Sequence, residues 1–115
     1  MEELLGRCEL AEWAMQNGWG PCCAGLTEEH IISKGMLVKN KAAKKLVNGK
    51  YKKYFIAHVC LTHNATTKAA DTKSARLYLL RKRWRQYGPA FAEAVGELRN
   101  TFKVPPDYLS LEFLA

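Results

Sequence analysis

Hydrophobic residues recur in the first third of the chain with two different periods. Residues 2–15 carry apolar side chains at the spacing of a short amphipathic helix, which the Gly- and Pro-containing segment 17–21 ends. Residues 22–25 then predict a tight, knuckle-like turn. Apolar and polar positions alternate over residues 26–32, which predicts a first short strand, and residues 33–35 end it.

The middle of the chain predicts a helical segment between two strands. Residues 36–47 place apolar side chains at near-helical spacing and indicate a basic helical insertion or an ordered loop, followed by a turn at residues 48–49. Aromatic and branched side chains over residues 54–59 favour a second strand. We expect the next helix to begin near residues 63–64.

The last third of the chain predicts helices. Residues 69–85 indicate a long basic helix, which residues 88–89 end, and residues 90–102 indicate another helix with one apolar face. The apolar tail 108–114 would dock on the core or on a second copy, so a homodimer is one option. The sequence therefore predicts a small α+β fold with additional packed helices.

Length and charge narrow the class of protein. A chain of 115 residues suits a single domain, residues 1–115, whose modest core would gain from a bound metal ion. The net charge of +7 favours a polyanionic partner, and nucleic acid, most simply DNA, is the expected one. No segment approaches a membrane helix, and the acidic start differs from an export signal, so we expect a cytoplasmic protein with no membrane partner.

Basic residues gather in two parts of the sequence. No Asp or Glu occurs between His30 and Ala70, and a second basic run lies at residues 81–85. Such runs are often solvated faces, but two of them beside a candidate active site favour salt-dependent, largely sequence-independent phosphate contacts. The residues expected to make them are Lys34, Lys39, Lys41, Lys44, Lys45, Lys52, Lys53, Arg81, Lys82, Arg83 and Arg85.

The cysteines point to a metal site. In a reducing compartment, cysteines are more often metal ligands or buried thiols than disulfides. Cys60 and His63 have the C-x-x-H spacing of half a structural zinc site. Cys8 and one of Cys22 or Cys23 would supply the other half, because adjacent cysteines rarely bind one ion. Buried thiols without a metal are the alternative.

Three further residues have the chemistry of phosphodiester cleavage, which needs a base for water and a cation for the phosphate. His30 can be the base, and Glu29 and Asn64 offer oxygen ligands to Mg²⁺ or Mn²⁺. Alternatively, His30 is a hydrogen-bonded core residue and Asn64 a helix cap. Neighbours on a strand point to opposite faces, so placing Glu29 and His30 at one phosphate requires a twist or bulge.

Residues 26–32 and 59–64 together resemble the HNH, or ββα-metal, endonuclease superfamily, most closely its phage junction-resolving branch. The resemblance covers about residues 22–78 and implies a ββα-metal core with a zinc knuckle. Residues 89–115 would then form a C-terminal helical extension. The upstream Cys-x-x-Cys of that branch is absent here, and the basic insertion between the strands has no counterpart.

The resemblance also implies roles for individual residues. His30 would be the general base, and Glu29, in place of the commoner Asp, would hold a catalytic Mg²⁺ with Asn64. Cys60 and His63, the latter in place of a Cys, would bind a separate structural Zn²⁺. A phage-encoded endonuclease that hydrolyses DNA is therefore the expected function.

Two other functions remain open at this level. One is a non-catalytic, zinc-stapled nucleic-acid-binding or regulatory protein. The other is a small phage-encoded inhibitor whose basic face binds an acidic protein. The sequence leaves open DNA against RNA, nicking against double-strand cutting, and branched against linear substrates.

Overall fold

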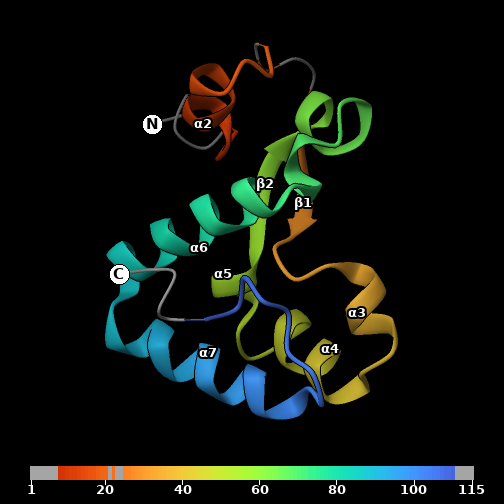
Figure 1. Ribbon diagram of the computed structural model, residues 1–115, viewed down its shortest axis with the longest axis vertical. Helices are drawn as coiled ribbons and strands as arrows, with labels where there is room; N and C mark the ends of the chain where they lie inside the picture. The colour runs from red at the N-terminus through yellow and green to blue at the C-terminus, as the bar shows by residue number, and fades with distance from the viewer. Residues whose placement is uncertain (1–7, 21, 23–24, 111–115) are drawn as a thin grey trace.

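An antiparallel hairpin lies at the centre of the molecule, and helices surround it (Figure 1). The computed structural model describes residues 8–20, 22 and 25–110. Strand β1 (Leu26–His30) pairs with β2 (Ile56–Cys60), so that Leu26 lies opposite Cys60 and His30 opposite Ile56. In the part of the chain that is described, the fold is a mostly helical α+β arrangement, which confirms the predicted fold class at this level.

Short helices fill the connection between the two strands. They are α3 (Lys34–Val38), α4 (Lys41–Asn48) and α5 (Lys52–Phe55). The sequence predicted one helical segment here, but Asn40 interrupts it. The Asn40 side chain accepts a hydrogen bond from the Ala43 N–H and so caps α4, while Ser33 caps α3 in the same way through Met36.

The second strand begins later than its sequence predicted. Tyr54 and Phe55 belong to α5 and are buried, although residues 54–59 were expected to be strand. Their rings pack against the C-terminal helices: Tyr54 lies edge-on to Tyr87 at 4.9 Å and Phe55 contacts Phe91 at 5.8 Å between centroids. Tertiary packing of these rings outweighs their local preference for strand.

Helical elements follow β2 as far as Thr101. They are a π-helical turn η1 (Thr62–Thr66), a 3₁₀ turn η2 (Ala69–Asp71), α6 (Lys73–Tyr87) and α7 (Pro89–Thr101). The predicted helix over residues 69–85 begins only at Lys73, because the Thr72 hydroxyl caps α6 through the Ala75 N–H. Gly88, at φ 58° and ψ −130°, joins α6 to α7.

The described part of the predicted N-terminal helix begins only at Ala11. Helix α2 spans Ala11–Gln16, and residues 8–10 precede it as a turn, while residues 2–7 lie outside the described part of the chain. Trp13 is buried, stacks on Trp19 with centroids 6.1 Å apart, and donates its Nε1–H to Ser74. These contacts attach α2 to the start of α6.

The C-terminal tail docks on the body of the chain. Tyr108 and Leu109 are buried, and Arg99 donates a hydrogen bond to the Leu109 carbonyl. The rest of the predicted tail, residues 111–114, lies outside the described residues. None of the helices in the described ranges combines the length and the apolar character that crossing a bilayer demands.

A Cys3His cluster and two adjoining cavities

Backbone pairing beside β2 brings Cys8 to the end of the hairpin. The Glu9 N–H donates to the His58 carbonyl, and the His58 N–H donates to the Glu9 carboxylate at 2.7 Å. Arg83 on α6 holds the same carboxylate through two hydrogen bonds, of 2.6 and 3.1 Å. The segment before α2 therefore lies against β2, and Cys8 lies beside Cys60.

Four potential ligands meet at this end of the hairpin. The sulfur atoms of Cys8, Cys22 and Cys60 and a ring nitrogen of His63 all lie within 4.8 Å of one another. The three sulfurs lie 3.8, 3.7 and 3.2 Å from His63 Nδ1, in that order. Tetrahedral zinc with ordinary bond lengths separates a sulfur from a nitrogen by about 3.6 Å. The cluster is therefore close to the geometry that a zinc ion needs.

The second nitrogen of His63 fixes the form of the ring. Nε2 lies 3.1 Å from the Gly20 carbonyl, which can only accept, so Nε2 carries the hydrogen. Nδ1 of the neutral ring then keeps its lone pair toward the three sulfurs. A backbone partner on the far nitrogen is the usual support of a histidine that binds a metal.

The close approach of the thiols to one another favours a bound cation. Burial, together with the neighbouring sulfurs of Cys8 and Cys60, raises the pKa of Cys22 to about 12. Burial is also the main cause of the raised pKa of Cys8. The thiols of Cys8 and Cys22, whose ionisation is disfavoured, would be stabilised as thiolates by a divalent cation beside them.

The predicted ligand set is therefore brought together. Cys8, Cys22, Cys60 and His63 form a largely buried cluster that is consistent with a structural Zn²⁺ site. Cys23, the alternative to Cys22, lies outside the described residues.

Glu29 and Asn64 line one cavity of about 670 Å³ beside the hairpin. We call it the acidic cavity, because three carboxylates line it. Its lining residues are Glu28, Glu29, Ser33, Lys34, Gly35, Met36, Asn64, Asp71, Arg76 and Tyr108. The two residues predicted to hold a catalytic cation thus line the same cavity, although they come from β1 and from the turn after β2.

A chain of hydrogen bonds orients the amide of Asn64. The Thr27 hydroxyl donates to the Val59 carbonyl at 2.8 Å, so its oxygen can accept from Asn64 Nδ2 at 2.6 Å. The amide nitrogen of Asn64 is thereby fixed on Thr27, and Oδ1 remains for another partner. An amide oxygen held in this way is a suitable ligand for a hard cation.

The acidic cavity also favours a cation electrostatically. Burial raises the pKa of the Glu29 carboxyl, Arg76 opposes that shift, and the nearby carboxylate of Asp71 adds to it. A divalent cation would stabilise the charged form of both carboxylates. Carboxylate and amide oxygens are the ligand types that Mg²⁺ and Mn²⁺ prefer.

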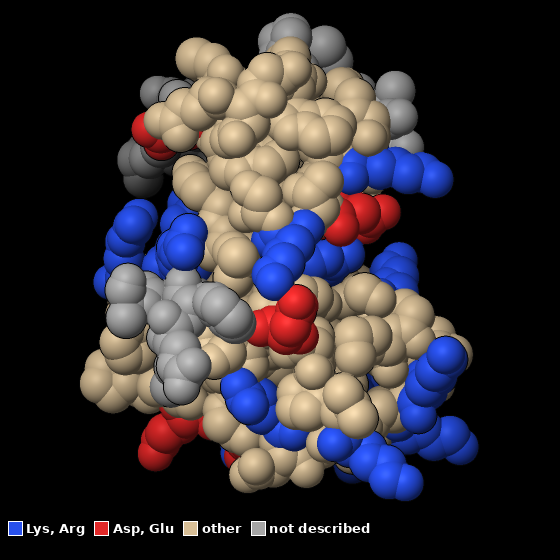
Figure 2. All heavy atoms as spheres, viewed as in Figure 1, with Lys and Arg blue, Asp and Glu red and all other residues tan. Residues whose placement is uncertain are grey.

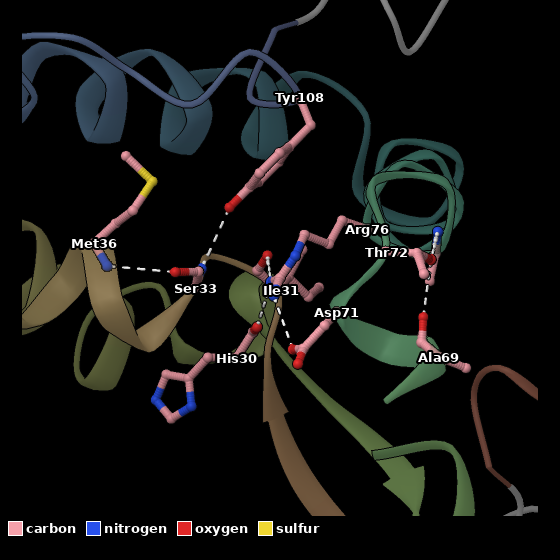
Figure 3. Close-up of polar contacts among 10 residues, drawn as sticks. His30, Ile31, Ser33, Met36, Ala69, Asp71, Thr72, Arg76 and Tyr108 are labelled. Carbon is pink, nitrogen blue, oxygen red and sulfur yellow. Dashed lines mark hydrogen bonds and ion pairs between the residues drawn. The ribbon is translucent and has the colours of Figure 1, made fainter. Parts of the chain in front are cut away.

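His30 lies in a different cavity, of about 320 Å³, which we call the basic cavity. Its lining residues are His30, Lys34, Leu37, Val38, Lys44 and Asn48. The His30 Nε2–H donates to Asn48 Oδ1 at 2.9 Å, while Nδ1 is buried and has no hydrogen-bond partner among the described residues. Figure 3 shows the imidazole on the other side of β1 from Asp71 and Arg76.

Regular pairing explains why His30 and Glu29 separate. The register runs without a bulge from Leu26 to His30, so neighbouring side chains alternate between faces. The bulge that would bring both side chains to one position is not found within β1. Lys34 lines both cavities and marks the place where they adjoin.

Arg76 and Asp71 belong to the acidic cavity, although the sequence analysis did not select them. Buried Arg76 donates to the carbonyls of His30 and Ile31 at 3.0 and 2.5 Å and pairs with Asp71 at 3.2 Å (Figure 3). Its guanidinium lies 5.6 Å from the centre of the Tyr108 ring. One signal was present: Asp71 is the first acidic residue after the long stretch that has none.

The predicted phosphate contacts differ in exposure. Arg83 is buried, and its nitrogens donate to the Glu9 carboxylate and to the carbonyls of Lys53 and Ile56, so we remove it from that set. Lys82 is half-buried near Glu9. The exposed members are Lys34, Lys39, Lys41, Lys44, Lys45, Lys52, Lys53, Arg81 and Arg85. In Figure 2 several basic side chains lie along the side where Figure 1 draws α3 and α4.

No protein family model, curated protein or solved structure matches this chain.

Proposed function

We propose that this protein is a metal-dependent endonuclease that hydrolyses DNA, with a divalent cation held by Glu29 and Asn64 in the acidic cavity. The observation that carries the proposal is the meeting of these two residues in one cavity, beside a cluster suited to zinc. The excess of basic residues supports a nucleic acid as the substrate.

The acidic cavity would bind the cation, and the basic cavity would supply the general base. A bound Mg²⁺ or Mn²⁺ would neutralise the charge that develops on the phosphate. Lys34 lines both cavities, so a phosphate beside it would have Glu29 and Asn64 on one side and His30 on the other. In this arrangement His30 would accept a proton from water at Nδ1, once substrate binding opens access to that buried atom, while the Nε2–H donated to Asn48 fixes the orientation of the ring.

A metal ion in the Cys3His cluster would support the acidic cavity through the backbone that the two share. His63 and Asn64 are adjacent in η1, so a metal ion bound by His63 also fixes the backbone that carries Asn64. Zinc would therefore stabilise the end of the hairpin and keep the Asn64 amide on Thr27.

Nicking of supercoiled plasmid in Mg²⁺ or Mn²⁺ tests the proposal. The wild-type protein should cut, and the variants E29Q, N64A and H30A should lose cutting while they keep zinc and DNA binding. The E93Q variant is the control, since Glu93 is an exposed carboxylate on α7, and it should cut like the wild type.

A non-catalytic nucleic-acid-binding protein is the second candidate. The observation that favours it is the separation of His30, held by Asn48, from Glu29 and Asn64. A wild-type protein that binds DNA but never nicks it in either metal would establish this candidate and overturn the nuclease.

A further inference from the structure

The two adjoining cavities differ in their balance of charge. Three carboxylates line the acidic cavity together with Lys34 and Arg76, whereas no Asp or Glu of the described chain lines the basic cavity, to which Lys34 and Lys44 contribute ammonium groups. Charge of one sign in a hollow attracts ligands of the other sign. A cation suits the first cavity, and an anion suits the second.

The walls of the basic cavity are held in place by hydrogen bonds. Asn48 at the end of α4 accepts from His30 on β1, and Asn40 caps the start of α4. The Asn40 amide also donates to the Thr101 carbonyl at 2.6 Å, which anchors the α3–α4 junction to α7. The cavity therefore exists before any ligand binds, and little ordering would oppose binding.

The remaining lining residues suit a nucleotide better than a free anion. Leu37 is buried in the wall, whereas Val38 is 70% exposed at the rim. An apolar rim beside two lysines gives one surface for a sugar and another for its phosphate. The volume of about 320 Å³ leaves space for such a group.

We propose that the basic cavity binds a backbone phosphate of a polynucleotide, next along the strand to the phosphate at the acidic cavity. Lys34, which lines both cavities, would contact both phosphates, and Lys44 would contact the one in the basic cavity. The path of the polynucleotide across β1, from one cavity to the other, rests on the proposed function. Phosphate binding in the basic cavity does not itself require cleavage.

Two neighbouring lysines of α4 provide a matched test. Lys44 lines the basic cavity, whereas Lys45 is also exposed but lines a separate hollow with Ala42 and Leu46, so this proposal excludes Lys45 from the phosphate contacts. Binding of a fluorescent DNA oligonucleotide to zinc-loaded wild-type, K44A and K45A proteins would be measured over a range of salt concentrations without added Mg²⁺. For K44A we expect about five- to tenfold weaker binding and a salt slope reduced by about one.

The K45A variant should stay within about twofold of the wild type, and K44R should restore binding, since it keeps the charge. Equal losses in K44A and K45A would overturn the inference, because they would indicate a diffuse basic face. Titration with inorganic phosphate separates the two sources of the anion. If K44A weakens phosphate binding but not oligonucleotide binding, the cavity serves a free anion and the inference fails.

Plasmid nicking is read separately on the same proteins. A difference between K44A and K45A in binding, together with a wild type that does not cut, would keep the phosphate site and remove the nuclease. A wild type that cuts, with no difference between the two variants, would remove the site and keep the nuclease.

Discussion

At the scale of single residues, Thr27 has a role that its identity does not reveal. Its hydroxyl donates to the Val59 carbonyl, so the oxygen can only accept from Asn64, and the amide of Asn64 has one orientation. The orientation of a proposed metal ligand thus depends on a residue that would not touch the metal.

Replacing Thr27 with Val keeps the branched shape that suits a strand and removes the acceptor. For T27V we expect the Mg²⁺ concentration for half-maximal cutting to rise by about tenfold or more, the usual effect of losing such a support. Zinc content and the unfolding midpoint should change little. A T27V protein with unchanged Mg²⁺ dependence would show that Thr27 does not orient a ligand.

Arg83 illustrates a limit of sequence reasoning at the same scale. Within the basic run at residues 81–85, nothing in the sequence distinguishes Arg83 from Arg85. In the structure, Arg83 is 6% exposed and bridges Glu9 to β2, whereas Arg85 is exposed. Only the three-dimensional position of Glu9 separates a structural arginine from a surface one.

Removing Arg83 should leave the half-buried Glu9 carboxylate without its main partner. For R83Q we expect a loss of about 3 kcal/mol of unfolding free energy, since breaking one side of a buried ion pair is costly. The R85Q control should change it by about 0.5 kcal/mol or less. Urea unfolding of both zinc-loaded variants measures the difference, and similar losses would contradict the assignment.

At the scale of elements, the sequence predicted which segments form strands and helices better than it predicted their ends. The alternation of residues 26–32 and the branched residues after Phe55 identified both strands of the hairpin. Asn40 and Thr72 set helix ends through side-chain caps that periodicity does not register. Tyr54 lies in α5 and not in the strand because its ring packs against Tyr87.

The corner between α6 and α7 depends on one backbone conformation. Gly88 has φ 58° and ψ −130°, a region that side chains with a Cβ avoid, although no atom stands where that Cβ would be. A side chain at position 88 would therefore be disfavoured by the backbone conformation and not by a steric clash. Gly96 lies inside α7, also with open space around its Cβ position.

Alanine at these two positions should have opposite effects. We expect G88A to destabilise the protein by about 1–3 kcal/mol and G96A to stabilise it by about 0.5–1 kcal/mol, because alanine favours a helix interior. Thermal and urea unfolding of both variants measure the signs. A stabilising G88A would mean that the corner adopts another conformation.

At the scale of the whole molecule, the cluster joins segments that are distant in sequence. Cys8 precedes α2, Cys22 follows it, and Cys60 and His63 lie at the end of β2 and in η1. The ligand types and the C-x-x-H spacing were readable from the sequence. Cys8 joins the cluster through the pairing of Glu9 with β2, which the sequence does not show. Which cavity receives His30 was not readable, because it depends on whether the strand stays regular.

Loss of the metal should therefore affect the region around the cluster more than helix α7. The H63A variant removes a buried ligand, whereas the H58A control removes an exposed imidazole on the adjacent strand. We expect H63A to lose bound zinc and to unfold at lower denaturant concentration, while H58A keeps one zinc per chain. In H63A, hydrogen exchange should increase first in η1 and in the segment beside β2, where the ligands lie, and later in α7, which packs mainly against α4 and α6. Exchange that rises equally everywhere would mean that zinc supports the whole fold, and equal zinc content in both variants would rule out the cluster as the metal site.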